Sequence, residues 1–84
     1  PKLSRVAQLV YETAWRLGVL PGACICPDDA PAGIQAANAA GMVSVAIPNC
    51  FSAHLDFSHA RFVLPDLAVF ARALPALVAS DLTP

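Results

Sequence analysis

The sequence predicts an α/β fold in which about three short parallel strands are covered by three helices. The main observation behind this prediction is the pattern of residues 23–49. They have the pattern of an apolar strand, an acidic turn, a helix of small residues and a second apolar strand. Parallel strands need a crossover of this kind, because a hairpin turn reverses the chain direction. An amphipathic pattern before this unit and a strand and helix pattern after it complete the chain.

Composition and charge exclude several classes of protein. Much of the hydrophobic fraction of 57% is alanine, which buries little area per residue. The longest uncharged run, residues 30–55, is interrupted by glycine, proline and asparagine, so it lacks the roughly 20 consecutive apolar residues of a membrane span. A net charge of −1 with five scattered Lys and Arg residues argues against nucleic-acid binding. The first residues lack the ordered sections of a secretory signal, so we expect a cytoplasmic location.

Residues 4–17 are predicted to form the first helix. Ser4 is its expected N-cap, and Gly18 can end it in the left-handed conformation. Apolar positions three and four residues apart would form one stripe, made of Val6, Leu9, Val10, Thr13, Ala14 and Leu17. Trp15 falls opposite this stripe, so a lone helix would leave it in water. It either packs on something outside this chain or is a surface aromatic.

The first strand is predicted at residues 23–26, after a turn at residues 19–22. Pro27 is expected to end this strand, because proline has no amide donor. Asp28 and Asp29 then follow its carboxyl end, where open parallel sheets place their active sites.

A crossover helix is predicted to start near Asp29 or Ala30, with Pro31 in its first turn. Its small side chains let it lie close to the sheet, and Gly33 lets the backbone come closer still. Gly41 is expected to cap it, and residues 42–47 form the second strand.

The remaining chain is predicted to be a loop, a strand and a helix. Residues 49–58, with His54 and Asp56, form a surface loop, and residues 60–64 form the third strand. Asp66 opens the last helix, which Pro75 is expected to kink or restart.

Cys24, Cys26 and Cys50 are an odd number of thiols, which argues against a disulfide scaffold. Cys24 and Cys26 share one face of the predicted strand and could offer two thiolates to a metal. No second Cys or His pair completes a tetrahedral set, so we interpret them as buried free thiols that act as small apolar side chains.

Residues 28–42, DDAPAGIQAANAAGM, are followed by a valine-rich strand that ends in PN. This segment resembles the fourth signature motif of the haloacid dehalogenase (HAD) superfamily. The resemblance is greatest to phosphatases similar to beta-phosphoglucomutase, which typically read E-D-S/A-x-x-G-x-x-A-A-x-A-A-G-M here. The match covers fifteen contiguous positions, and RLGVLPGACIC and DFSHARFVLPDLAVF on either side also resemble the family. It implies a partial Rossmann-like (HAD-type) three-layer fold, with residues 1–84 as a single partial domain from the C-terminal part of the core.

The resemblance implies that Asp29 and Asp28 lie at a Mg²⁺ site. Asp29 corresponds to the family's acidic residue that helps to hold Mg²⁺, and Asp28 stands where a Glu commonly acts through metal-bound water. Mg²⁺ needs only one or two protein carboxylates besides a phosphate, and a helix N-terminus offers amides to phosphate oxygens. The alternative is that both acids only cap the helix.

Other family residues have no clear counterpart. The aspartate nucleophile of the family belongs to a D-x-D motif on an earlier strand, and this motif is absent, so no catalytic residue is assigned. Asp56, Asp66 and Asp81 lie in the wrong context for it. Lys2 fits the family's phosphate-binding lysine only with a shifted register, and otherwise it is a surface charge. Neither histidine is assigned to catalysis.

The resemblance implies the C-terminal part of a Mg²⁺-dependent HAD-like phosphatase that acts on a phosphorylated small molecule. In the family, phosphoryl transfer passes through an aspartyl-phosphate, and a cap segment absent here selects the substrate. The alternative is a non-catalytic binding or scaffold module. Under either interpretation, absence of the nucleophile strand leaves the first strand with an open edge, and we expect the remaining chain or another copy to pair with it.

Overall fold

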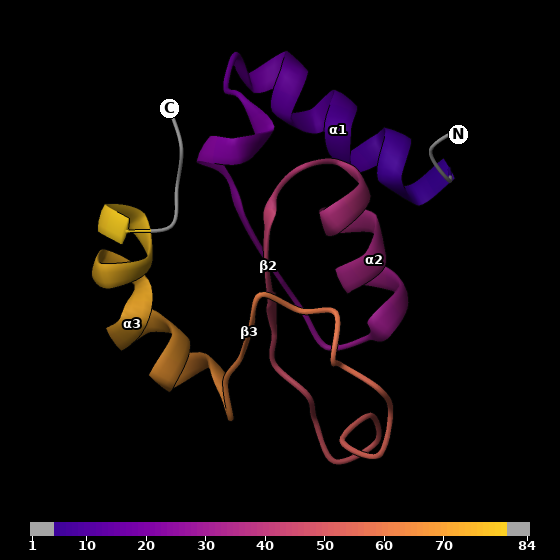
Figure 1. The fold of residues 1–84 in the computed structure, drawn as a ribbon, viewed down its shortest axis with the longest axis vertical. Helices are drawn as coiled ribbons and strands as arrows, with labels where there is room; N and C mark the ends of the chain where they lie inside the picture. The colour runs from indigo at the N-terminus through magenta and orange to yellow at the C-terminus, as the bar shows by residue number, and fades with distance from the viewer. Residues whose placement is uncertain (1–4, 81–84) are drawn as a thin grey trace.

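A computed structural model describes residues 5–80 and confirms the predicted α/β class. Its elements, in chain order, are α1 (Arg5–Leu17), the 3₁₀ turn η1 (Pro21–Ala23), β1 (Ile25–Asp28), α2 (Pro31–Ala39), β2 (Val43–Ala46), β3 (Phe62–Val63) and α3 (Leu67–Ser80). The strands form one parallel sheet in the order β1-β2-β3. The sheet lies between two helical layers, with α2 on one side and α3 on the other (Figure 1).

Strand β1 begins later than predicted and includes Pro27. The N–H of Val43 donates to the carbonyl of Cys24 at 3.0 Å, and the N–H of Ile47 donates to that of Asp28 at 2.8 Å. Backbone groups of successive strand residues point to opposite sides, so Pro27 faces the open edge of the sheet rather than β2. The prediction that Pro27 ends the strand was therefore wrong, because an edge strand tolerates proline where no ladder donor is needed.

The face of the sheet toward α3 holds an apolar core. Val45 and Ile47 are buried there with Leu77 of α3, and the partly buried side chains around them are Ile25, Phe62, Leu64, Phe70 and Ala73. Full burial of one such aliphatic side chain stabilises the fold by about 1.5–3 kcal/mol.

Helix α3 starts as predicted and continues through its internal proline. The N–H of Val69 donates to Asp66 Oδ1 at 2.8 Å, which makes Asp66 the N-cap. Pro75 does not split α3, so the predicted restart was wrong. Since Leu77 beyond it is buried against the sheet, tertiary packing offsets the hydrogen bond that proline removes.

Helix α2 lies against the other face of the sheet, where Ile34 is buried with Ala46 of β2. Its other buried residues, Ala36 and Ala37, are small, as predicted. Ala30 is the N-cap, with Pro31 in the first turn, as expected. Gly41 ends the helix with φ of +81°, and the next N–H, of Met42, donates back to the helix at 2.9 Å.

Helix α1 packs against α2, and its buried residues include Ala14 of the predicted stripe. The side chains of Val6 and Val10 in that stripe lie outside what the structure describes. Ala7 and Ala14, which are two turns apart, are buried, whereas Leu9 and Leu17 are 64% and 72% exposed. The predicted stripe was therefore wrong for both leucines, because close packing of two helices favours the small alanines. Trp15 is 75% exposed, which confirms that the helix leaves it in water. The predicted N-cap at residue 4 lies outside the described residues.

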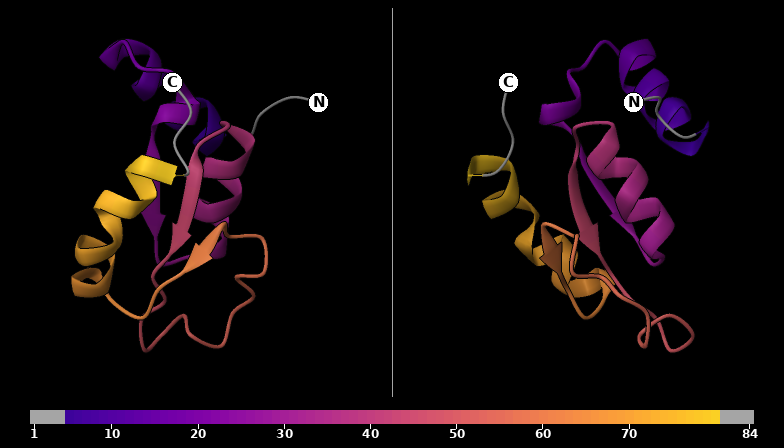
Figure 2. Two further views of the ribbon diagram at one scale, coloured as in Figure 1. Left: turned by 60° about the vertical axis from the view of Figure 1, so that its left-hand side comes forward. Right: turned by 45° about the vertical axis from the view of Figure 1, so that its right-hand side comes forward.

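No helix within residues 5–80 has both the length and the apolar character that crossing a membrane requires. The cytoplasmic location stays a prediction. Figure 2 shows the loop between β2 and β3 extending beyond the end of the sheet where β1 and β2 finish. The predicted surface loop is largely exposed, although Ser52 and Phe57 are buried.

A buried polar link joins α2, β2 and the entry to β3. The hydroxyl of Ser44, fully buried, donates to Asn38 Oδ1 at 2.7 Å and accepts the N–H of Arg61 at 3.0 Å. Asn38 Nδ2 in turn donates to the carbonyl of His59 at 2.8 Å. One serine therefore holds the crossover helix to the sheet and fixes where the chain returns to it.

We expect Ser44→Ala to lower the free energy of unfolding by about 1–2 kcal/mol, because it removes the donor to Asn38 Oδ1 and one of the two acceptors of the Arg61 N–H, which keeps the Ser44 carbonyl at 3.1 Å. Denaturant titration followed by circular dichroism measures the loss. Ser58→Ala is the matched control, since Ser58 is exposed and its loss should change little. Equal effects of the two substitutions would contradict a structural role for the Ser44 link.

Candidate functional site

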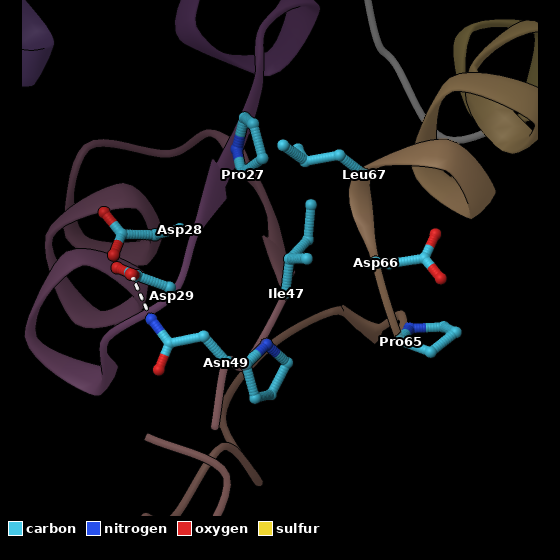
Figure 3. Close-up of a pocket in the computed structure, with 9 residues that line it drawn as sticks. Pro27, Asp28, Asp29, Ile47, Asn49, Pro65, Asp66 and Leu67 are labelled. Atoms are coloured by element: carbon cyan, nitrogen blue, oxygen red, sulfur yellow. Dashed lines mark hydrogen bonds between the residues drawn. The ribbon is translucent and has the colours of Figure 1, made fainter. Parts of the chain in front are cut away.

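A pocket of about 610 Å³ opens where β1 and β2 end and α3 begins. Its polar lining residues are Asp28, Asp29, Asn49 and Asp66, and the others are Pro27, Ile47, Pro48, Pro65 and Leu67 (Figure 3). Both acids singled out in the sequence thus lie beside a pocket at the carboxyl end of the sheet, which is the usual place for ligands in parallel sheets.

Asp28 is half-buried and faces the start of α2. Its Oδ1 accepts the N–H of Ala30, the N-cap of α2, at 2.8 Å. Its carboxylate also lies over Gly33, where an added Cβ would overlap it. Free amides and the helix dipole favour a negative charge at this end of a helix. The contact holds the turn that leads into α2, and α2 itself has no side-chain cap hydrogen bond.

Asp29 is exposed and makes a different contact. Its Oδ2 accepts a hydrogen bond from Nδ2 of Asn49 at 2.8 Å (Figure 3). Within the part of the chain that the structure describes, no hydrogen bond uses Oδ1 of Asp29. Asp29 is thus tied to the loop that follows β2 and not to the helix N-terminus, and it keeps one carboxylate oxygen for a ligand.

Asn49 was not among the site residues predicted from the sequence, where the PN pair marks only the end of a strand. Asn at such a point, followed by Ser52, is nevertheless a signal for a side-chain-stabilised turn. That signal predicts the turn but not the contact with Asp29, because the two residues lie twenty positions apart.

The remaining candidates lie apart from these two acids. Asp66 lines the pocket, but its carboxylate points away from Asp28 and Asp29 in Figure 3. Lys2 lies outside the described residues and stays a prediction. Asp56 is exposed in the loop, where hydrogen bonds from the hydroxyl and the N–H of Ser58 lower the pKa of its carboxyl group.

The donor set fits Mg²⁺ in kind, because Asp28 and Asp29 present hard carboxylate oxygens and Oδ1 of Asp29 has no hydrogen bond within residues 5–80. Over the same range, no three His, Cys, Asp or Glu side chains gather closely enough to hold a metal ion. The two acids would therefore form one side of a Mg²⁺ site, with water, substrate or further residues supplying the other ligands.

The three cysteines are free thiols, as expected, but none is fully buried. Cys24 and Cys26 are half-buried and Cys50 is exposed. Burial, the nearby Asp28 carboxylate and then Cys24 raise the pKa of the Cys26 thiol. A raised pKa keeps this thiol protonated and weakly nucleophilic at neutral pH, which agrees with a packing role.

Two curated proteins match most of this chain. This chain is 42% identical over 60 residues to "Protein CbbY, plasmid" of Cupriavidus necator. The matched stretch covers 71% of this chain and 24% of that protein. It is also 40% identical over 62 residues to "Protein CbbY" of Rhodobacter capsulatus. That matched stretch covers 73% of this chain and 27% of that protein. The chain thus spans about a quarter of the length of the curated relatives it matches. These matches are consistent with the resemblance to the HAD superfamily.

Neither a protein-family model nor a solved structure matches this chain.

The close approach of Gly33 to Asp28 predicts a specific effect of Gly33→Ala. In the wild-type background we expect a loss of about 1–3 kcal/mol in the free energy of unfolding, because the new methyl group displaces the carboxylate. In an Asp28→Ala background the same change should be neutral or stabilising by up to about 1 kcal/mol, since alanine is the better helix former. Denaturant titration of the four proteins in this cycle measures both values, and equal effects in the two backgrounds would contradict the contact.

The environment of Cys26 predicts that its thiol reacts more slowly than the exposed thiol of Cys50. At neutral pH we expect iodoacetamide to modify Cys50 first and Cys26 much more slowly, as followed by mass spectrometry of peptides. Asp28→Asn removes a negative charge that raises the pKa of Cys26, so it should increase the thiolate fraction and speed this reaction. Asp56→Asn, in the exposed loop, is the control and should leave the rate at Cys26 unchanged.

Proposed function

We propose that this chain is the C-terminal part of a Mg²⁺-dependent phosphatase of the HAD type, in which Asp29 and Asp28 help to hold the metal ion. The two CbbY relatives suggest a HAD-like phosphatase. The observation that carries the proposal is the position of the motif. Residues 28–42 resemble the family's fourth signature, and its two acids lie at the carboxyl ends of parallel strands beside a pocket.

The two acids would have different tasks. Asp29 is exposed and keeps Oδ1 without a hydrogen bond in the described part of the chain, so we assign it direct contact with Mg²⁺. Asp28 is held by the N–H of Ala30 and by its place over Gly33, so we assign it a contact through metal-bound water. Bound Mg²⁺ would neutralise the charge that develops on a transferred phosphoryl group.

The start of α2 would complete the part of the site that this chain supplies. Pro31 has no N–H, and the N–H groups of Gly33 and Ile34 donate to the carbonyl of Ala30, which leaves the N–H of Ala32 at the positive end of the helix dipole. This end of the helix would attract a phosphate oxygen of a phosphorylated small-molecule substrate. The nucleophilic aspartate would come from a D-x-D motif that is not among these 84 residues.

The open edge of the sheet is the reason to propose a pairing partner for β1. Strand β1 is the first strand in the order β1-β2-β3, and its residues are exposed or only half-buried. We propose that the remaining chain of a longer parent protein, or another copy, pairs with this edge. In the HAD type of core, the strand at this place carries the nucleophile, which would bring it to the same end of the sheet as Asp28 and Asp29.

The proposal predicts that Asp29→Asn, in the longest natural chain that contains this sequence, lowers Mg²⁺-dependent hydrolysis of an aryl phosphate by about 100-fold or more. The substitution keeps the shape of the side chain and removes the negative charge that holds the cation. Asp56→Asn, in the exposed loop, is the matched control and should retain wild-type activity. Wild-type protein without Mg²⁺-dependent phosphatase activity would favour the binding or scaffold module instead.

A further inference from the structure

Asn49 uses both ends of its side-chain amide. Its Oδ1 accepts the N–H of Phe51 at 2.8 Å and the N–H of Ser52 at 3.0 Å. Its Nδ2 donates to Asp29 Oδ2 at 2.8 Å. The amide therefore joins the first turn of the loop after β2 to the acid that follows β1.

The turn decides which way the amide points. Because two backbone donors take Oδ1, the NH₂ end of the side chain is directed to Asp29, and the reverse orientation would place donors against donors. The backbone of Asn49 is held as well, since its N–H donates to Ser52 Oγ at 3.0 Å. Ser52 is buried, with 8% of its surface exposed, so this anchor belongs to the packed part of the loop.

This arrangement gives the exposed carboxylate of Asp29 a defined orientation. An exposed aspartate without a partner rotates among several conformers, and a ligand must then restrict it on binding. The bond from Asn49 occupies Oδ2 and leaves Oδ1 available to a cation. The other acidic side chains of the pocket do not share this contact, because Asp28 bonds to the start of α2 and Asp66 to the start of α3.

We infer that Asn49 is a positioning residue, which orients the Asp29 carboxylate for Mg²⁺ through its side-chain NH₂ group. This inference rests on the proposed function, because that function supplies the identity of the cation. Outer partners that orient a metal-binding carboxylate typically change metal affinity by about 10- to 100-fold when they are removed.

The test separates the contact with Asp29 from the fold of the loop. Asn49→Ser supplies a hydroxyl oxygen that can accept the N–H groups of the turn, and it removes the side-chain NH₂ group that donates to Asp29. In the full natural chain, isothermal titration calorimetry with Mg²⁺ alone should show a dissociation constant about 10-fold higher than that of wild type. Phosphatase activity should recover at saturating Mg²⁺. Asn49→Thr, with the same acceptor, provides a second variant if the serine protein does not fold.

The control is Ser58→Ala, which alters an exposed turn of the same loop away from the pocket and should leave the Mg²⁺ dissociation constant unchanged. Folded Asn49 variants that bind Mg²⁺ as tightly as wild type would overturn the inference and leave the proposed function intact. The same would follow if activity stayed low at saturating Mg²⁺ with an unchanged dissociation constant, which is the sign of a structural role. Wild-type protein that binds no Mg²⁺ would instead overturn the proposed function, and the role of Asn49 with it.

Discussion

The close approach of α2 to β1 is the constraint on which the rest of the structure depends. Asp28 fits over the start of the helix because Gly33 has no Cβ, and the buried alanines that follow keep the helix near the sheet. A bulkier helix would stand farther away, since side-chain size sets the distance between packed elements. Its N-terminus would then no longer lie beside the two acids. The small residues that make the motif conspicuous in the sequence are thus also the ones that shape the pocket.

Two neighbouring acids acquire different surroundings from this geometry. Asp28 depends on local contacts, because its partners lie within five residues of it in the chain. Asp29 depends on Asn49, which reaches it from the loop after the next strand. Parallel strands make such a contact possible because their carboxyl ends meet at one edge of the sheet. The orientation of the second acid therefore requires the crossover to be folded and the loop to be in place.

The parts of the fold that the sequence predicts are those set by local chemistry. Gly41 ends α2, and Asp66 starts α3, because each satisfies the backbone groups of its own helix. The parts that the sequence does not predict depend on contacts between elements that are distant in the chain. Exposure of Leu9 follows from the choice of α2 as the partner of α1, and the buried hydroxyl of Ser44 has no periodic signal. For the candidate site, the position of the acids could be predicted, whereas the Asn49 contact could not.

Pro27 affects which strands can add to the outer edge of β1 in solution. Along this edge Ile25 points both an N–H and a carbonyl outward, whereas Pro27 has a carbonyl alone. A foreign strand that docks here would leave one of its own acceptors without a donor, which costs free energy in a dry interface. Indiscriminate strand addition, the usual route from an exposed edge to aggregation, is thereby disfavoured. A strand that places no acceptor opposite Pro27 does not incur this cost. The proline therefore favours the addition of such strands to the sheet over others.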